Sequence, residues 1–396
     1  MEKQIITIAA FGFDVRERTN ERGASFVRAF KKCGYNVTHV STDFDHAQKA
    51  YVDLPLEEVV DGVKVKRLHV LAYTKNLSIK RILSHLQFAF KLLRVLNSLV
   101  EKPNYVYCVT PTSTSAYVAG KYCKKHGIKF IIDLIDLWPD SLLPLYSSRM
   151  ITIATSPWSY ITHKAYEMAD FICGESVKYA NHAHQFNPDV PWFPIYLGVN
   201  KEKVNRLIAE SNVKVVDKKA PLRLCYGGDL GNSYGFDAIL KALNYIQQKG
   251  IQYEMYFVGG GDRQEYIQNY SIEHNLNVLI TGKIPYCDYL KYLNSCDIGF
   301  NAFGPNTKVV HSYKFNDYIA TGNLVLSNLK GETAEMIDKY KIGLNYEDNK
   351  LGDILLNVCQ NWMVYNTWRN NIDEFVHDVL DADIIYPRVI KEIEKK

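Results

Sequence analysis

The chain has 396 residues, of which 47% are hydrophobic and 23% charged, and its formal net charge is +4. This composition is typical of a globular protein long enough for two domains, and so small a charge excess does not indicate nucleic acid as a partner. Eight cysteines without Cys-x-x-Cys spacing argue against zinc and disulfide frameworks and favour a reducing, cytoplasmic compartment. We expect neither a signal peptide nor a membrane span, because no sufficiently long, uncharged apolar run occurs.

Short apolar runs alternate with helical patterns through the first half of the chain. Helical periodicity occurs, for instance, at Gly23–Cys33 and Ala116–His126. This alternation predicts right-handed crossovers and a mostly parallel sheet covered by helices. The strands predicted here are Ile5–Ala10, Asn36–Ser41, Val63–His69, Tyr105–Thr110, Lys129–Leu134 and Phe171–Gly174.

A longer helical pattern covers Ser78–Val100. Its apolar residues recur at positions 79, 82, 83, 86, 90, 93 and 96, whereas Lys80, Lys91 and Arg94 follow another stripe. Two interpretations stay open. The helix either packs on a core with a solvated edge, or lies with its apolar side on an anionic membrane surface.

The second half repeats the alternation of strands and helices, with helical patterns such as Asp237–Gln248 and Tyr286–Asn294. A polar, charge-rich stretch at 200–219 separates the halves. Two parallel sheets are therefore expected, with a ligand site in the cleft beyond the carboxyl ends of their strands. The strands predicted here are Leu222–Tyr226, Glu254–Val258, Val278–Thr281, Ile298–Phe303, Leu324–Ser327 and Ile342–Tyr346.

Glycines follow three successive strands of the second half. Gly228 and Gly231 follow the first, Gly260 the second and Gly282 the third. Each alone is compatible with a tight turn, but together they favour backbone amides that approach an anion closely. Thr333 fits the cap of a helix whose first amides face the same cleft. Neither Gly-x-Gly-x-x-Gly nor a Gly-x4-Gly-Lys-Ser/Thr loop is present, so we predict no nicotinamide, flavin or ATP site.

The segment His311–Gly322 places Lys314 and Asp317 three residues apart at the start of a helical run. Positions i and i+3 share one face of a helix, so both side chains point the same way. A cation suits a diphosphate, and a carboxylate suits the paired hydroxyls of a ribose. The alternative for an isolated Lys-x-x-Asp is a surface salt bridge near a helix cap.

Taken in order, the motifs of this chain resemble those of a glycosyltransferase of the two-domain GT-B fold. The similarity is specifically to family 4, in the subgroup that builds bacterial capsule and O-antigen polysaccharides. It covers nearly the whole chain. The segments that carry it are Asp133–Ser141 (Asp-Leu-Ile-Asp-Leu-Trp-Pro-Asp-Ser), Ala169–Asp170 with Glu175–Ser176, Leu197–Asn200, Tyr226–Gly235, Val258–Gly261, Gly282 and Ser312–Gly322.

The resemblance implies an α/β chain with two Rossmann-like, doubly wound parallel sheets that face a central cleft. Residues 1–198 would form the acceptor-side domain and 199–383 the nucleotide-sugar domain, with a helix at about 384–396 crossing back. The implied activity is that of a retaining, metal-independent hexosyltransferase that uses a UDP-sugar as donor substrate and needs no other cofactor. A polyprenyl-diphosphate-linked acceptor would bring the enzyme to the inner face of the membrane.

By the same resemblance, Asp317 matches the acidic residue that holds the donor ribose. Lys314 matches the basic residue expected at the diphosphate. Three departures are evident, one of which is Ile135 where many relatives carry a sugar-contacting histidine. The first acid of the family's Glu-x7-Glu motif falls at Val309, and Asp229 and Tyr234 stand where relatives carry Arg and Lys. The loop Phe11–Arg22 matches one that closes on the sugar phosphate or lines the acceptor side. The residues expected to bind the donor are Gly228, Gly231, Gly260, Arg263, Gly282, Lys283, Ile284, Lys308, Ser312, Lys314, Asp317 and Thr333.

Lys314 and Asp317 are also the expected catalytic groups, together with Asp136 at the end of a predicted strand. Asp136 either orients the acceptor hydroxyl or caps a helix, and Trp138 is either a core residue or a platform for a sugar ring. The eleven histidines show no ligand spacing, so no metal site is predicted. Two other functions stay open, a UDP-sugar 2-epimerase of the same fold and a non-catalytic, glycosyltransferase-like partner subunit. The sequence does not determine the donor sugar, the nucleobase of the donor or the acceptor.

Overall fold

The computed structural model describes residues 3–16, 22–76, 78–140, 149–217, 222–307 and 309–396. The chain divides into two compact units. The first is Met1–Gly198 with Ala382–Lys396, and the second is Val199–Asp381. The first unit thus combines a segment that ends at Gly198 with a C-terminal segment that starts at Ala382. Each unit has a sheet and core of its own.

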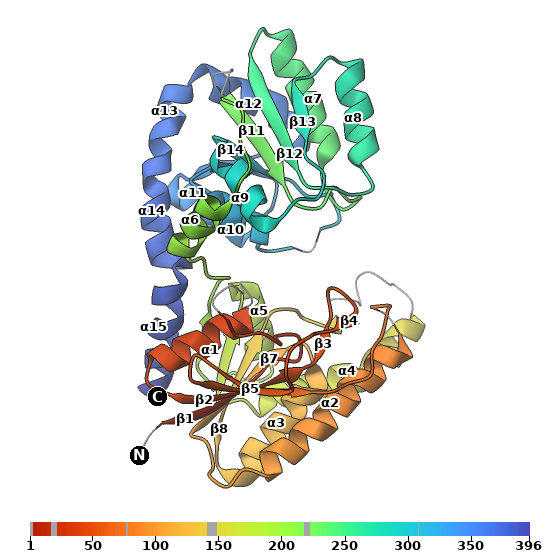
Figure 1. Ribbon diagram of the computed structural model, residues 1–396, viewed down its shortest axis with the longest axis vertical. Helices are drawn as coiled ribbons and strands as arrows, with labels where there is room; N and C mark the ends of the chain where they lie inside the picture. The colour runs from red at the N-terminus through yellow and green to blue at the C-terminus, as the bar shows by residue number, and fades with distance from the viewer. Residues whose placement is uncertain (1–2, 17–21, 77, 141–148, 218–221, 308) are drawn as a thin grey trace. The chain divides into compact units, whose positions relative to one another are not determined.

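An eight-stranded sheet forms the centre of the first unit, in the order β10-β9-β8-β7-β1-β2-β6-β5 (Figure 1). All its pairs are parallel except β5 with β6. The strand order proceeds in one direction from β1 and in the other from β7, so it reverses between these two strands. The strands are β1 (Gln4–Ile8), β2 (Asn36–Thr42), β5 (Glu57–Val60), β6 (Val63–Leu68), β7 (Tyr105–Thr110), β8 (Lys129–Leu134), β9 (Phe171–Gly174) and β10 (Trp192–Pro194), and a separate hairpin joins β3 (Phe44–Asp45) to β4 (Ala50–Tyr51).

Successive residues of these strands pack into two different hydrophobic cores. Ile6 and Ile8 of β1 belong to the core on one face of the sheet, whereas Ile5 belongs to the core on the other. This is the period of two that a strand covered on both faces requires. The first core also holds residues of α2 (Ile79–Asn97), α3 (Ser113–His126), α4 (Arg149–Glu167) and α5 (Val177–His184), and the second holds residues of α1 (Arg22–Lys32) and α15 (Ala382–Glu394).

Helix α15 is fastened to the first unit although it comes from the far end of the chain. It lies beside α1, as Figure 1 shows, and the hydroxyl of its Tyr386 accepts a hydrogen bond from the Gly198 N–H at 2.8 Å. The ring of Tyr386 also packs on Phe26 of α1, with the ring centroids 4.6 Å apart. The crossing back of the C-terminal helix is thus explained by specific packing.

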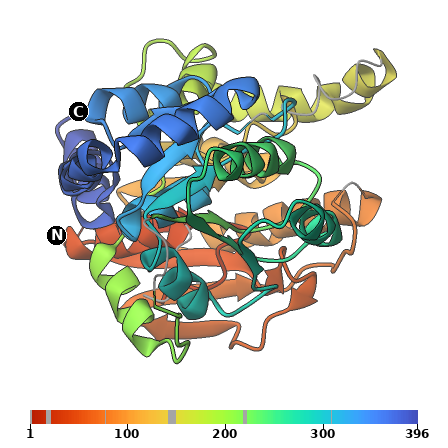
Figure 2. The ribbon, with the colours of Figure 1, turned by 90° about the horizontal axis from the view of Figure 1, so that it is seen from above.

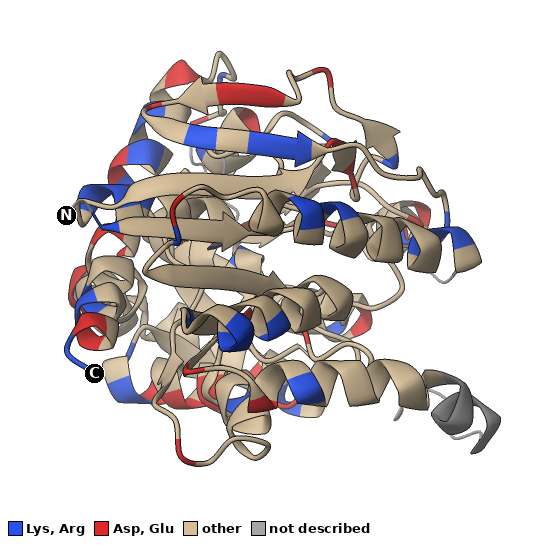
Figure 3. Cartoon of the chain, turned by 90° about the horizontal axis from the view of Figure 1, so that it is seen from below, with Lys and Arg blue, Asp and Glu red and all other residues tan. Residues whose placement is uncertain are grey.

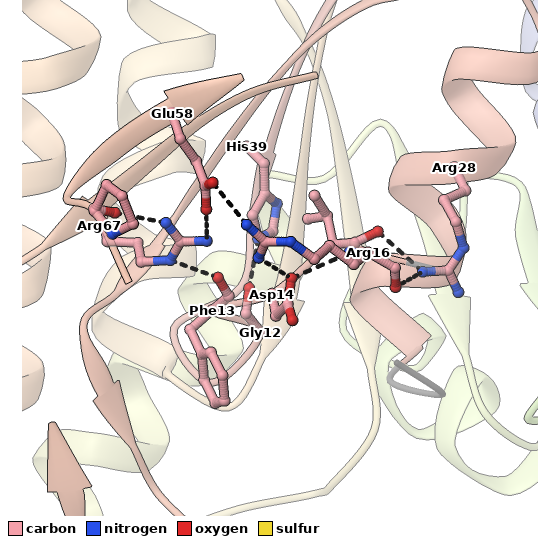
Figure 4. A network of polar contacts seen from close by, with 10 residues as sticks. Gly12, Phe13, Asp14, Arg16, Arg28, His39, Glu58 and Arg67 are labelled. Atoms are coloured by element: carbon pink, nitrogen blue, oxygen red, sulfur yellow. Dashed lines mark hydrogen bonds and ion pairs between the residues drawn. The ribbon is translucent and has the colours of Figure 1, made fainter. Parts of the chain in front are cut away.

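The described part of the loop that follows β1 is held by ion pairs and hydrogen bonds (Figure 4). Arg67 of β6 donates to the carbonyl of Phe13 at 2.7 Å and pairs with Glu58 of β5 at 2.7 Å. Arg28 of α1 donates to the carbonyl of Val15 at 3.1 Å. Arg16 of the loop also pairs with Glu58 of β5 at 2.7 Å, so the first half of the predicted Phe11–Arg22 loop is anchored to β5, β6 and α1. Its residues 17–21 lie outside the described part of the chain.

The second unit is built on a six-stranded sheet in the order β13-β12-β11-β14-β15-β16, with every pair parallel. Its strand order reverses between β11 and β14. Residues of β11, β12 and β14 are buried throughout, as in a sheet covered by helices on both faces. The strands are β11 (Leu222–Gly227), β12 (Tyr253–Val258), β13 (Val278–Ile280), β14 (Ile298–Asn301), β15 (Leu324–Ser327) and β16 (Gly343–Asn345).

Helices connect these strands and continue beyond the last one. Figure 2 shows α7, in green, next to the blue α12, and the two helices are in contact. The helices of the second unit are α6 (Lys201–Glu210), α7 (Phe236–Gln248), α8 (Gln264–Glu273), α9 (Tyr286–Asn294), α10 (Tyr313–Ala320), α11 (Glu332–Tyr340), α12 (Leu351–Gln360), α13 (Trp362–Thr367) and α14 (Asn371–Phe375), followed by a π-helical turn at Val376–Leu380.

Two of the differences from the elements predicted by sequence have a cause that the structure shows. The polar stretch at 200–219 contains a helix, α6, which begins where the Asn200 side chain accepts a hydrogen bond from the Lys203 N–H at 2.8 Å and which packs on α9. Strand β14 ends at Asn301 instead of Phe303, because the Phe303 N–H bonds to the side chain of Asn328 at 2.9 Å rather than to a strand. A side-chain partner distant in sequence ends this strand.

Candidate functional site

A cavity of about 720 Å³ lies in the second unit at the carboxyl ends of its strands. It is placed where the strand order reverses, the position at which open parallel sheets bind ligands. Its walls come from the loops after β11, β12, β13 and β14 and from the first turns of α9 and α10. The lining residues are Gly227, Gly228, Asp229, Tyr234, Val258, Gly259, Gly260, Lys283, Ile284, Tyr286, Tyr289, Phe303, Val309, His311, Ser312, Tyr313, Lys314 and Asp317.

Helix α10 brings Lys314 and Asp317 to the same cavity. The helix begins where the Ser312 hydroxyl accepts a hydrogen bond from the Phe315 N–H at 3.2 Å. Ser312 thereby satisfies one of the free amides of the first turn. The i, i+3 spacing then directs both charged side chains toward the cavity.

Lys314 is 8% exposed and is enclosed by aromatic rings. Its ammonium lies 4.2 Å from the ring centroid of Tyr226, 3.8 Å from that of Tyr234 and 4.9 Å from that of Phe303. It donates a hydrogen bond to the Tyr226 hydroxyl at 2.5 Å. Burial lowers the pKa of Lys314 to about 7, although the nearby Asp229 opposes the shift. The charge of this lysine is thus poised to respond to an anion in the cavity.

Asp317 is held by two tyrosines of α9. The Tyr286 hydroxyl donates to one carboxylate oxygen at 2.7 Å and the Tyr289 hydroxyl donates to the other at 3.1 Å. Burial raises the pKa of Asp317 to about 6, and the two hydrogen bonds limit the rise. The carboxylate is therefore oriented but retains lone pairs that can accept hydrogen bonds from the hydroxyls of a ligand.

The glycine turns after β11 and β12 lie against each other. The Gly228 N–H bonds to the carbonyl of Val258 at 3.0 Å, and the Leu230 N–H bonds to the carbonyl of Gly260 at 3.3 Å. A Cβ on Gly259 would lie 1.8 Å from the carbonyl oxygen of Gly228, so no larger residue fits. The backbone can therefore come close to a ligand at this wall of the cavity.

Of the residues predicted to bind a donor, seven line this cavity: Gly228, Gly260, Lys283, Ile284, Ser312, Lys314 and Asp317. Four others do not. Arg263 pairs with Asp237 at 2.8 Å, and the Thr333 hydroxyl donates to the Val310 carbonyl at 2.6 Å. Gly231 and Gly282 lie in the neighbouring turns. Lys308 lies outside the described residues.

Asp136 belongs to the first unit, where it follows the carboxyl end of β8. A negative charge there helps to stabilise the partly buried Arg81 of α2, whose guanidinium packs over the ring of Trp138 at 5.5 Å. Near Asp136 lies Glu175, which follows β9. Burial raises the pKa of Glu175 to about 8, with Asp133 and Asp136 contributing. The sequence did not single out Glu175 as a titratable group with an altered pKa.

The sequence also missed the aromatic and imidazole parts of the cavity. Tyr286, Tyr289 and Phe303 line it, and Tyr226 stands behind Lys314. His311 lines it as well, and its ring donates to the Asn316 side chain at 2.7 Å. Burial lowers the pKa of His311 to about 4, so the ring is neutral near pH 7. The only signal in the sequence that could have found these aromatic and histidine residues was their position next to the ends of predicted strands.

We expect the affinity of this cavity for a ribose-diphosphate ligand to be highest between about pH 6 and pH 7. Above pH 7 Lys314 loses the proton that attracts the diphosphate, and below pH 6 Asp317 gains one and becomes a weaker acceptor for hydroxyls. Calorimetric titration of UDP at several pH values would measure this. An affinity independent of pH from 5 to 9 would contradict the roles of both groups.

Comparison with solved structures places the whole chain in the GT-B fold. Sucrose-phosphate synthase of Thermosynechococcus elongatus superimposes with a TM-score of 0.73 at 15% identity, over 99% of this chain and 98% of that one. Anabaena HepE in complex with UDP gives a TM-score of 0.65 at 13% identity, over 100% of both chains. WaaG, a glycosyltransferase involved in lipopolysaccharide biosynthesis, gives 0.62 at 11% identity, over 98% and 99%. Neither a family model nor a curated protein matches the sequence.

Proposed function

We propose that the protein is a glycosyltransferase that moves a sugar from a UDP-sugar to a saccharide acceptor. One observation carries the proposal: a cavity at the strand-order reversal of the second unit brings together a buried lysine, an oriented carboxylate and a glycine-rich backbone wall. These groups complement a diphosphate and a ribose. HepE, which shares the fold, has been solved with UDP and with UDP-glucose.

These groups would support a direct transfer of the sugar. The bond between the anomeric carbon and the diphosphate oxygen breaks, and its electron pair leaves with UDP. The acceptor oxygen bonds to the anomeric carbon on the same face, in keeping with retention, and its proton passes to the departing diphosphate. Lys314 and the loop amides would stabilise the negative charge that develops on the diphosphate, so no metal ion is needed for this step.

A panel of nucleotide-sugars in a thermal-shift assay would test donor binding, since a ligand of the native state raises the melting temperature. We expect UDP-sugars to stabilise the protein more than GDP- or ADP-sugars. The best donor is then incubated with and without an acceptor. Conversion of its sugar without acceptor would indicate an epimerase, and absence of any binding would indicate a non-catalytic partner subunit. Either outcome would overturn the proposal.

The exposed face of α2 suggests where the acceptor is found. Its apolar side chains Ile79, Leu83, Leu86 and Phe90 are 46% to 75% exposed. Neither α2 nor α3 contains Asp or Glu, and Figure 3 shows basic residues without acidic ones along both helices. No helix in the described parts of the chain is long and apolar enough to cross a bilayer.

We therefore propose that α2 lies on the inner leaflet of an anionic membrane and that the acceptor is a polyprenyl-diphosphate-linked saccharide in surface-polysaccharide assembly. Apolar side chains would enter the lipid boundary, while Lys80, Lys91 and Arg94 would contact anionic head groups, each worth about 1 kcal/mol. The resemblance of the sequence to enzymes of capsule and O-antigen assembly supports this acceptor class.

Leu86→Ser with Phe90→Ser should lower binding to vesicles that contain anionic phospholipid by at least about tenfold, because two apolar side chains no longer enter the lipid. Co-sedimentation with vesicles measures this. Val364→Ser is the matched control, since Val364 of α13 is 60% exposed on the second unit. Equal binding of the double variant and the control would rule out α2 as the membrane contact.

A further inference from the structure

Three side chains from three elements of the first unit converge on one point. Asp140 lies in the segment after β8, His163 is on α4 and His182 is on α5. Their ligand atoms, one carboxylate oxygen and two imidazole nitrogens, all lie within 4.8 Å of one another. No spacing rule could reveal the group, because His163 is 23 and His182 is 42 residues away from Asp140.

Both histidines of the group contact the same carboxylate oxygen. Nε2 of His163 lies 2.9 Å and Nε2 of His182 lies 3.1 Å from the same oxygen, Oδ2, of Asp140. Tetrahedral coordination with metal–ligand bonds of about 2.0–2.1 Å places neighbouring ligand atoms about 3.4 Å apart. Each nitrogen would therefore move by only a few tenths of an ångström from Oδ2, and the two nitrogens lie within 4.8 Å of one another.

Two surrounding contacts hold Asp140 and His163 in place. The Ser159 hydroxyl donates to the other oxygen of Asp140 at 3.0 Å. The ring of Phe186 stacks on His163 with the centroids 3.9 Å apart and the planes at 18°.

From this geometry we propose that Asp140, His163 and His182 bind one divalent transition-metal ion of the Zn²⁺ type. Two imidazoles and one carboxylate suit such an ion, and three protein ligands leave a position open for water. The side chains are between 16% and 27% exposed, so an ion can reach them from solvent. The bound ion would fasten the segment after β8 to α4 and α5.

This site is separate from the donor cavity, all of whose lining residues belong to the second unit. If this site bound no metal, the proposed transfer reaction would be unaffected, since that reaction needs no ion at the diphosphate. The alternative is a purely hydrogen-bonded group in which Asp140 accepts from two protonated ring nitrogens. The two alternatives differ in whether an added ion displaces those hydrogen bonds.

The purified, chelator-treated full-length chain is titrated with Co²⁺ and, separately, with Zn²⁺. We expect one equivalent of Co²⁺ to produce the visible absorption bands of a four-coordinate site, and one equivalent of Zn²⁺ to abolish them and to raise the melting temperature. His163→Gln and His182→Gln should each weaken Co²⁺ binding at least tenfold, and Asp140→Asn should do the same.

His184→Gln is the matched control. His184 is on the same helix as His182 but stacks on Trp192, with the centroids 5.5 Å apart. This variant should bind Co²⁺ as the wild type does. Circular dichroism of each variant shows whether it is folded, and UDP binding reports on the second unit independently. Absence of a stoichiometric Co²⁺ signal in the wild type, or binding that all three ligand variants retain, would overturn the proposal.

Discussion

Lys314→Met should lower kcat/KM for the UDP-sugar about 100-fold, equivalent to about 3 kcal/mol of transition-state stabilisation. Methionine retains the apolar stem that lies among Tyr226, Tyr234 and Phe303 but removes the charge. The departing diphosphate then loses the cation that α10 contributes to the cavity lining. Steady-state kinetics and calorimetric titration of UDP would measure the effect on turnover and on binding.

The same variant should be at least as stable as the wild type, which separates loss of function from misfolding. Burial holds the pKa of Lys314 at about 7, far below its ordinary 10.5. The unfolded state therefore binds an additional proton between these values, and the lysine lowers the free energy of unfolding there. Lys241→Met on the exposed side of α7 is the control for charge removal. Unchanged UDP affinity in Lys314→Met would refute the role of this lysine.

Asp317→Asn is expected to weaken UDP binding by about 10- to 100-fold. The amide keeps one oxygen, but its NH₂ group faces the hydroxyl of Tyr286 or Tyr289 and cannot accept from a ribose hydroxyl. Hydrogen bonds to a charged partner are worth about 1.5–3 kcal/mol, which gives this range. The loss of affinity below pH 6 should also disappear, because no carboxylate is left to titrate.

A ligand analogue sharpens this test. Wild-type protein should bind UDP more tightly than an analogue without ribose hydroxyls, whereas Asp317→Asn should bind the two almost equally. Glu265→Gln, an exposed carboxylate on α8, is the control and should discriminate as the wild type does. If Asp317→Asn still prefers UDP by the wild-type factor, the carboxylate does not contact the ribose.

Much of the fold was predictable from local sequence because its parallel strands are buried on both faces. Such strands are continuous apolar runs, and Tyr105–Thr110, Lys129–Leu134, Phe171–Gly174 and Leu324–Ser327 have the same bounds in the sequence prediction and in the structure. The short antiparallel strand β5 was missed. Two of its four residues are exposed glutamate and valine, so its apolar pattern is weak.

Only part of the site was predictable from the sequence. There is a physical reason why some of its features were predictable and others were not. Lys314 and Asp317 share one helix, so their common direction follows from the helical repeat. The rings that set the pKa of Lys314 come from β11 and from two loops, and the tyrosines that orient Asp317 come from α9. Distances between elements so far apart in the chain are set by the packing of the sheet.

The sequence by itself determined two α/β halves and a cation and an acid on one helix, since each depends on residues close together in the chain. Only the tertiary structure decided that the cation is enclosed by aromatic rings, that Glu175 has a raised pKa, and that Asp140 meets His163 and His182. These properties depend on burial and on contacts between distant segments, which no local pattern encodes.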